Sequence, residues 1–193
     1  MSNLFQKLEY EAFRAGITPR TKESRDWFRK KARAMRVNRS QLMQEDEIQL
    51  RSRSATGAMF MFFYDPKHKK TLPYYDSFPL IIAVGGAEGG FIVLNLHYLP
   101  IALRAKFLDG LMDTTNNKKY DESTKFAISY NMLKSASKLK YFKPCYKHYL
   151  TKHVRGRLAL VPAPEWEIAT FLPTADFQKA STSTIYGQSR SMI

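Results

Sequence analysis

Hydrophobic residues recur at helical spacing in the first quarter of the chain. Leu4, Leu8 and Ala12 fall on one face of a predicted helix, and Gly16 suits the left-handed C-cap that would end it. The opening segment is therefore expected to be an amphipathic helix with one face against a core.

A second helix is expected to follow closely. Thr18 suits its N-cap and Pro19 its first turn, and the helical pattern continues to about Arg36. A shorter helix is predicted over residues 41–50. Together these segments predict an N-terminal region built from helices.

The pattern changes to that of β-strands from Gly57 onward. GAMFMFFYDP is rich in aromatic residues, and FPLIIAV and FIVLNLHYL are short apolar runs. The stretch between the last two, GGAEGG, suits a hairpin turn that needs positive φ. Three strands so close together predict a small antiparallel sheet or half-barrel.

Helical spacing returns in the C-terminal half. PIALRAKFLDGLMD and the stretch after Asp121 each have one apolar face, and KPCYKHYLTKHV is expected to form a further helix with Pro144 in its first turn. RLALV is typical of a strand, whereas PAPEWEIATFLP stays open between helix and strand. The expected fold class is α+β: N-terminal helices, a central sheet or half-barrel, and a helical C-terminal half with a short additional strand.

Three regions are expected along the chain. Residues 1–53 form a helical extension that carries a basic helix, and residues 54–173 form an α+β core domain. Residues 174–193 are polar and rich in Ser and Thr, which predicts an arm with a short helix. The candidate anchors of this arm on another subunit are Phe177, Ile185 and Tyr186.

Cations outnumber acids by a wide margin. There are 31 Lys and Arg residues against 17 Asp and Glu, which gives a formal net charge of +14 and a pI of about 9.9. Such an excess costs self-repulsion, so it favours an anionic partner over a surface that only solubilises. Nucleic acid, an acidic protein surface and anionic lipid are the candidate partners.

Cysteine usage and hydropathy indicate where the chain folds. Cys145 is the only cysteine, so no disulfide within the chain is possible and a reducing compartment is expected. The N-terminus contains acids and lacks a long apolar run, so no signal peptide is predicted. The longest apolar stretches are too short to cross a bilayer, which predicts assembly in the cytoplasm without membrane contact.

Residues that could carry catalysis are few. His148 and His153 are five positions apart, a spacing that does not align two metal ligands on one helix face. Cys145 beside His148 could be a nucleophile and a base, but a lone Cys in an aromatic segment is more often a core residue. Asp65 and Asp76 suit turns, and GGAEGG lacks the Lys-Ser/Thr of a phosphate loop. We therefore expect no enzyme activity, no metal and no cofactor.

One stripe of cations is expected on the second helix. Its members are spaced 3, 4, 4 and 3 residues apart, so they share one helix face. They are Lys22, Arg25, Arg29, Arg33 and Arg36. We call them the arginine stripe; Trp27 and Phe28 fall on the opposite, apolar side. Arginine suits phosphate contacts and equally suits carboxylates on a neighbouring subunit.

A second basic feature is an acid-free segment, residues 123–164, which contains no Asp or Glu. Its candidate contacts to nucleic acid or to an acidic partner are Lys138, Lys140, Lys143, Lys147, Lys152, Arg155 and Arg157. Tyr141, Phe142 and Tyr146 are interleaved with them and are candidates for base stacking. The alternative is that these aromatic residues belong to the core and that only the cations face solvent.

Several long motifs resemble a known family. FFYDPKHKKTLPYYDSFPLIIAV, FIVLNLHYLPIALRAKFLDGLMD, NNKKYDESTKFAISY, KYFKPCYKHYL and PAPEWEIATFLP are similar to a small virion-associated protein family of large contractile-tailed phages, whose members are often labelled DNA end protector proteins. The resemblance covers most of the chain. It implies a phage particle protein near the packaged DNA end, in the head–tail neck or in the tail, and it supplies no catalytic residues.

Two functions are compatible with these observations. The first is a non-enzymatic virion protein, assembled in the host cytoplasm, that contacts double-stranded DNA ends or the neck through its basic faces. The alternative is a tail or baseplate subunit whose basic faces dock on acidic neighbouring virion proteins.

Overall fold

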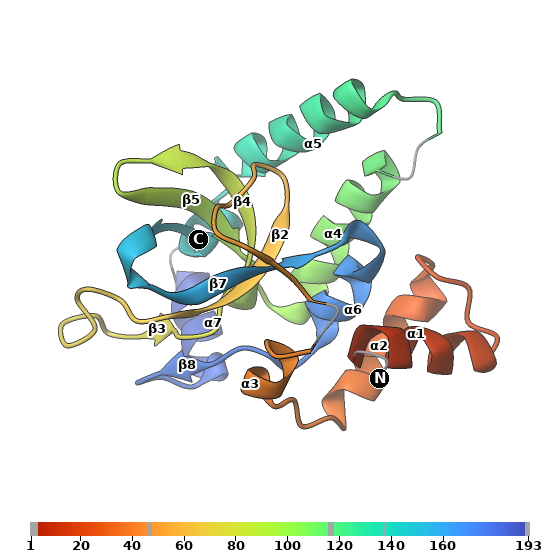
Figure 1. The fold of residues 1–193 in the computed structure, drawn as a ribbon, viewed down its shortest axis with the longest axis horizontal. Coiled ribbons are helices and arrows are strands. Elements are labelled where there is room, and N and C mark those ends of the chain that lie inside the picture. Colours follow the sequence, from red (N-terminus) through yellow and green to blue (C-terminus); the bar gives the residue numbers. More distant parts are fainter. Residues whose placement is uncertain (1–3, 46–47, 116–117, 137, 192–193) are drawn as a thin grey trace.

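A six-stranded antiparallel sheet forms the centre of the molecule, with strand order β1-β7-β2-β4-β5-β6 (Figure 1). The computed structural model describes residues 4–45, 48–115, 118–136 and 138–191. The strands of this sheet are β1 (Gln49–Arg51), β2 (Met59–Tyr64), β4 (Leu80–Ala87), β5 (Gly90–Asn95), β6 (Tyr146–Leu150) and β7 (Val154–Val161). A separate two-stranded sheet pairs β3 (Tyr75–Asp76) with β8 (Phe177–Gln178).

The central sheet curls into a half-barrel. Strands β6 and β7 follow each other in the chain, yet they lie four positions apart in the sheet. In a flat sheet four spacings would separate them by about 19 Å. The short 3-10 turn η3 (Thr151–His153) joins them, and from Leu150 to Val154 the chain spans at most about 14 Å. The two sides of the sheet must therefore curve toward each other.

Each face of the sheet has its own hydrophobic core because side chains alternate along a strand. Met59 and Met61 of β2 enter the larger core, which the helices cover, whereas Phe60 and Phe62 point to the opposite face. There Phe62 contacts Phe91 and Tyr149 with ring centroids 5.9 and 5.5 Å apart. This second core draws its buried residues from the strands alone, so the curl itself excludes water from it.

Helices cover the outer face of the half-barrel. They are α1 (Leu4–Arg14), α2 (Lys22–Arg33), α3 (Arg39–Leu42), α4 (Ile101–Thr115), α5 (Glu122–Ala136), α6 (Trp166–Phe171) and α7 (Thr182–Ser191). Short 3-10 turns are η1 (Leu96–Tyr98), η2 (Lys140–Cys145) and η4 (Ala163–Glu165). The predicted α+β class is confirmed, and the segment PAPEWEIATFLP, which was open between helix and strand, forms η4 and α6.

The helix predicted over residues 41–50 is wrong for most of its length. Asn38 caps a single turn, α3, by accepting hydrogen bonds from the amides of Ser40 and Gln41 at 3.1 Å each. Farther on, Gln49–Arg51 form β1 and pair with the edge of β7. Pairing with β7, more than a hundred residues away in the sequence, determines the structure of this segment. No local pattern carries that information.

The helix predicted for KPCYKHYLTKHV is also wrong. Its first residues complete the 3-10 turn η2, and Tyr146–Leu150 continue as strand β6, which pairs antiparallel with β5 from Gly90 to Leu94. Pairing with β5 outweighs the helical spacing of the aromatic residues. Tyr149 consequently points into the second core and is only 5% exposed.

The predicted anchors of the C-terminal arm are used within the chain. Ile185 on α7 is fully buried, and Phe177 packs against Tyr98 with ring centroids 5.1 Å apart. The Tyr186 hydroxyl accepts a hydrogen bond of 2.9 Å from Arg104 on α4. These three side chains therefore tie the arm to its own domain and are not available to another subunit.

Candidate nucleic-acid interface

Helix α2, which carries the arginine stripe, begins at Lys22, three residues later than the sequence predicts. Thr21, not Thr18, is the N-cap: it forms a capping box in which the hydroxyls of Thr21 and Ser24 each bond the other residue's amide, at 3.1 and 3.0 Å. The helix ends at Arg33, so Arg36 lies beyond it. The buried face consists of Ser24, Phe28 and Ala32.

Two of the five stripe residues are paired with acids. Arg25 forms an ion pair with Asp109 of α4, and Arg29 hydrogen-bonds Asp26 at 2.7 Å one turn before it. The remaining members, Lys22, Arg33 and Arg36, are exposed. The stripe therefore presents three cations to solvent and uses Arg25 to hold α2 against α4.

Arg25 is expected to contribute to stability, because its side chain is only 17% exposed and its partner Asp109 belongs to another helix. Arg25→Ala should lower the free energy of unfolding by about 1 kcal/mol, the upper end for a partly exposed pair. Lys22→Ala, one turn earlier and exposed, is the matched control and should change it little. Urea denaturation of both variants gives the comparison; equal stabilities would contradict the structural role of Arg25.

The acid-free segment leaves a set of cations exposed to solvent. Lys138, Lys143, Lys152 and Arg157 are exposed, and within the described residues their side chains make no hydrogen bond or ion pair. Lys140 is exposed as well. We refer to the first four as the open cations. Lys138 and Lys143 lie in the stretch before β6, Lys152 lies in the turn after β6, and Arg157 lies on β7.

Two further cations of this segment contact other residues of the chain. Arg155 hydrogen-bonds Asp65 at 2.7 Å, and the two cations beside Asp65, Lys69 and then Arg155, lower the pKa of its carboxyl to about 2. The Lys147 ammonium lies 4.2 Å from the centre of the Tyr98 ring, and burial lowers its pKa. Arg155 is exposed but already paired with Asp65, and Lys147 is half-buried, so neither charge is as available to a partner as those of the open cations.

The aromatic residues of the segment differ in exposure. Phe142 packs on Phe107 of α4 with ring centroids 5.1 Å apart, and the Tyr146 hydroxyl donates to the carbonyl of Leu133. Tyr141 is 53% exposed, between Lys140 and the half-buried Phe142. Of the three stacking candidates, Tyr141 is the one classed as exposed, whereas Phe142 and Tyr146 are half-buried.

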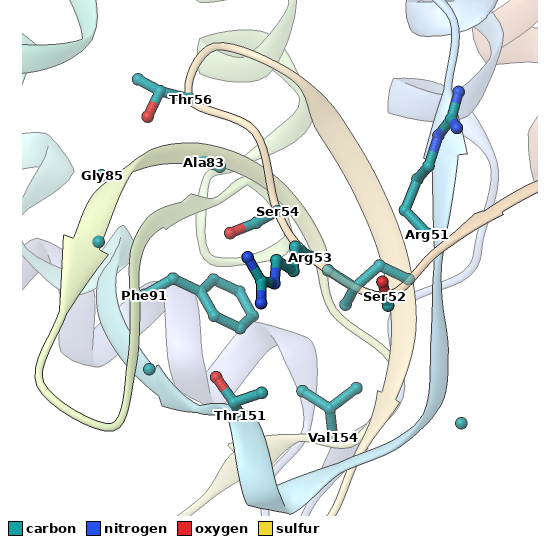
Figure 2. Close-up of a pocket in the computed structure, with 14 residues that line it drawn as sticks. Arg51, Ser52, Arg53, Ser54, Thr56, Ala83, Gly85, Phe91, Thr151 and Val154 are labelled. Atoms are coloured by element: carbon teal, nitrogen blue, oxygen red, sulfur yellow. The ribbon is translucent and has the colours of Figure 1, made fainter.

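Sequence reasoning missed one basic site at the mouth of the half-barrel. Arg51 and Arg53 flank Ser52 on the segment that enters β2, and they line a cavity of about 370 Å³ together with Thr151 of η3 (Figure 2). Lys152 follows Thr151 directly. The signal in the sequence was the run RSRSATG, which has alternating cations and hydroxyls and no acid.

The arginine stripe and the mouth of this cavity lie at opposite ends of the molecule. Figure 1 shows α2 at one end of the long axis and the β4–β5 hairpin at the other. The cavity mouth lies beside that hairpin, because the Thr151 amide donates to the carbonyl of Gly89 at 3.0 Å. The arginine stripe and the cavity mouth therefore form two separate basic surfaces.

A buried polar network that resembles catalytic residues is closed to solvent. The Asp76 carboxylate accepts a 2.7 Å hydrogen bond from Nδ1 of His97, whose Nε2 accepts from the Thr174 hydroxyl at 3.1 Å. All three residues are at most 1% exposed. Burial lowers the pKa of His97, with Asp76 opposing this in part, so His97 is neutral near pH 7. The network joins β3 to η1 and to the stretch before β8.

Cys145 is likewise a core residue. It is fully buried, and burial raises the pKa of its thiol to about 12, which makes it a poor nucleophile. His148, the base suggested for it, is exposed on β6, whereas Cys145 is buried. In residues 4–45, 48–115, 118–136 and 138–191 no three His, Cys, Asp or Glu side chains gather as metal ligands.

No helix in the described part of the chain is long and apolar enough to cross a membrane. Comparison with known proteins gave one family match and no curated protein or solved structure. The family model described as phage T4 terminal DNA protecting protein matches residues 3–190, nearly the whole chain. Because this match spans nearly the whole chain, the chain belongs to the phage T4 terminal DNA protecting protein family.

Proposed function

We propose that this protein covers the end of the packaged phage DNA by binding the duplex without reading its sequence. The family supports a role at a DNA terminus. The observation that carries the mode of binding is the set of open cations on a segment with no carboxylate of its own. Lys and Arg contacts to phosphates position a protein on DNA but carry no sequence information.

In this proposal the protein is part of the virion, at the DNA end or in the head–tail neck, after assembly in the host cytoplasm. Protection needs no reaction and no cofactor, because a bound protein blocks an exonuclease sterically. Lys140 and Tyr141 lie among the open cations and supply a further phosphate contact and a stacking surface for an unpaired end base.

Binding of a blunt linear duplex should depend steeply on salt. If about five phosphates are neutralised, log affinity should fall against log salt with a slope of about −4 or steeper. Fluorescence anisotropy with a labelled duplex of arbitrary sequence, repeated with a second sequence, measures both the slope and the sequence independence.

A closed circular duplex of the same sequence is the control for end recognition. Binding to the circle should be weaker per site, and the bound linear duplex should resist a double-strand exonuclease. If linear and circular DNA bind alike and the ends are degraded at the free rate, the protein is not an end protector.

The competing function is that of a tail or baseplate subunit docked on acidic neighbours. The C-terminal arm, which packs within its own chain, gives that function no support. The exposed stripe residues Lys22, Arg33 and Arg36 are the surface that it would use. It predicts no binding to linear duplex even at low salt, so the same titration separates the two functions.

A further inference from the structure

The cavity at the mouth of the half-barrel has the dimensions of a ligand site. Its volume is about 370 Å³, within the range of about 300–1,000 Å³ of small-molecule pockets. Its walls come from three parts of the chain: the segment before β2, the β4–β5 hairpin, and the turn from η3 into β7. Curling of the sheet brings these segments together (Figures 1 and 2).

The polar groups of this cavity suit a phosphate. Figure 2 shows the Arg53 side chain reaching into the cavity toward Phe91, while Arg51 points away. Within the described residues Arg53 has no hydrogen-bond or ion-pair partner. Hydroxyls of Ser54 and Thr151 stand on the walls, and no Asp or Glu lines the cavity. A guanidinium with neighbouring hydroxyls is the donor set that phosphate oxygens accept from.

The rest of the lining suits the sugar and base of a nucleotide. Phe91 and Val154 contribute apolar surface beside Arg53, as Figure 2 shows. Gly85 lines the cavity from β4, and a Cβ built on it would meet no atom within 4 Å, so the missing side chain leaves open space. A site for inorganic phosphate alone would not need this apolar wall.

We propose that this cavity holds the terminal nucleotide of a DNA strand, with its phosphomonoester on Arg53. A terminal phosphomonoester carries a charge of about −1.5 to −2 at pH 7, whereas a phosphodiester within the strand carries −1. The bidentate guanidinium therefore favours the terminal group. A recessed cavity also admits a strand end more readily than the middle of a strand, which would have to leave it again.

This inference rests on the proposed function, because it assumes that a DNA end reaches the cavity mouth. Lys152 and Arg51, both exposed, lie beside the entrance and would draw the backbone toward it. Glu88, at the tip of the β4–β5 hairpin, is the nearest carboxylate along that hairpin and does not line the cavity. The charged residues that line the cavity itself are Arg51 and Arg53.

The experiment compares blunt duplexes of one sequence that end in 5′-phosphate, in 3′-phosphate or in hydroxyl groups only. With the full chain, one of the two phosphorylated ends should bind about 10- to 100-fold more tightly than the hydroxyl end, as charge-assisted hydrogen bonds imply. Which one does so identifies the strand end that enters the cavity. Equal affinity for all three ends would overturn the inference.

Variants of the cavity test the residues that carry it. Arg53→Gln should remove the preference for the phosphorylated end, and Gly85→Val, which fills the cavity, should do the same. Arg33→Gln is the matched control: it removes the same charge from an exposed arginine of α2, on the separate basic surface, so the preference should persist. A preference that survives Arg53→Gln in folded protein contradicts the assignment.

Failure of this inference can be told apart from failure of the proposed function. Tight but undiscriminating binding of all three duplexes removes the phosphate site and leaves end protection intact. If no duplex binds, the proposed function fails, and a dinucleotide with and without a terminal phosphate then probes the cavity directly by NMR. If neither dinucleotide changes the NMR chemical shifts of Arg53, the phosphate-site proposal fails as well.

Discussion

Replacing the four open cations with glutamine is expected to lower the affinity for a linear duplex by about 100- to 1,000-fold at 0.1 M salt, because each lost phosphate contact forfeits the release of a counterion. Lys138, Lys143, Lys152 and Arg157 have no competing carboxylate within the described residues, so their charge is available to DNA. The salt slope should fall by about 3 to 4 at the same time.

A charge-matched variant is the control for this result. Arg29, Lys31, Lys69 and Arg155 are each bound to an acid at 2.7 to 3.0 Å, so changing them to glutamine removes the same total charge from sites already neutralised. This variant should lose far less affinity. Equal losses in the two variants would mean that net charge, and not the placement of the open cations, governs binding.

Asp76→Ala is expected to destabilise the fold by about 3–5 kcal/mol, the effect of removing one partner from a buried charged network. Oδ2 of Asp76 accepts from His97 at 2.7 Å and from Asn95 at 3.1 Å. Oδ1 accepts from the amides of Phe78 and Asp176 at 3.1 and 3.2 Å. The alanine variant leaves four donors, three of them buried, without this acceptor.

Guanidinium denaturation measures this loss, and Asp76→Asn is the informative comparison. Asn can still accept from the two amides through its oxygen, but its NH2 group meets the N–H of His97, so an intermediate loss is expected. A loss below about 1 kcal/mol for Asp76→Ala would show that the network adds little net stability.

Asp76 and His97 also make the stability of the fold depend on pH. Because the pKa of His97 lies below its ordinary 6.5 in the fold, the unfolded chain binds the proton more tightly, and stability is lost as the pH falls below about 6.5. Burial would raise the pKa of Asp76, but His97 and the hydrogen bonds outweigh it, so a further loss is expected below about pH 3.8. Unfolding midpoints measured from pH 7.5 to pH 4 should therefore decrease steadily; an unchanged midpoint would contradict this.

Local patterns predicted the elements whose partners lie close in sequence. The β4–β5 hairpin follows from two apolar runs around GGAEGG, where Gly89 adopts φ +68°, and α4 follows from its apolar face. β6 was mistaken for a helix because its aromatic residues also fit helical spacing. The pairing partner that decides between the two, β5, lies more than fifty residues earlier.

The residues of the candidate site could also be predicted only in part from the sequence. Exposed cations such as Lys143 could be named from charge and spacing, since an acid-free segment is visible in the sequence. The ion pair of Arg25 with Asp109 and the cavity around Arg53 could not, because each depends on segments that the fold brings together. Sequence shows which charges exist, whereas the fold decides which of them are neutralised.

The position of β7 also has a consequence for synthesis. This strand lies between β1 and β2, so that Phe60 pairs with Leu160, and the hydrogen-bonding edge of β2 stays open until the ribosome has released residues beyond 160. α2 packs on α6, which emerges later still. The nascent chain must therefore wait with aromatic strands exposed, and long-range pairing of this kind is slow and vulnerable to aggregation. We therefore expect folding of this chain to benefit from chaperones that shield those strands until β7 has been synthesised.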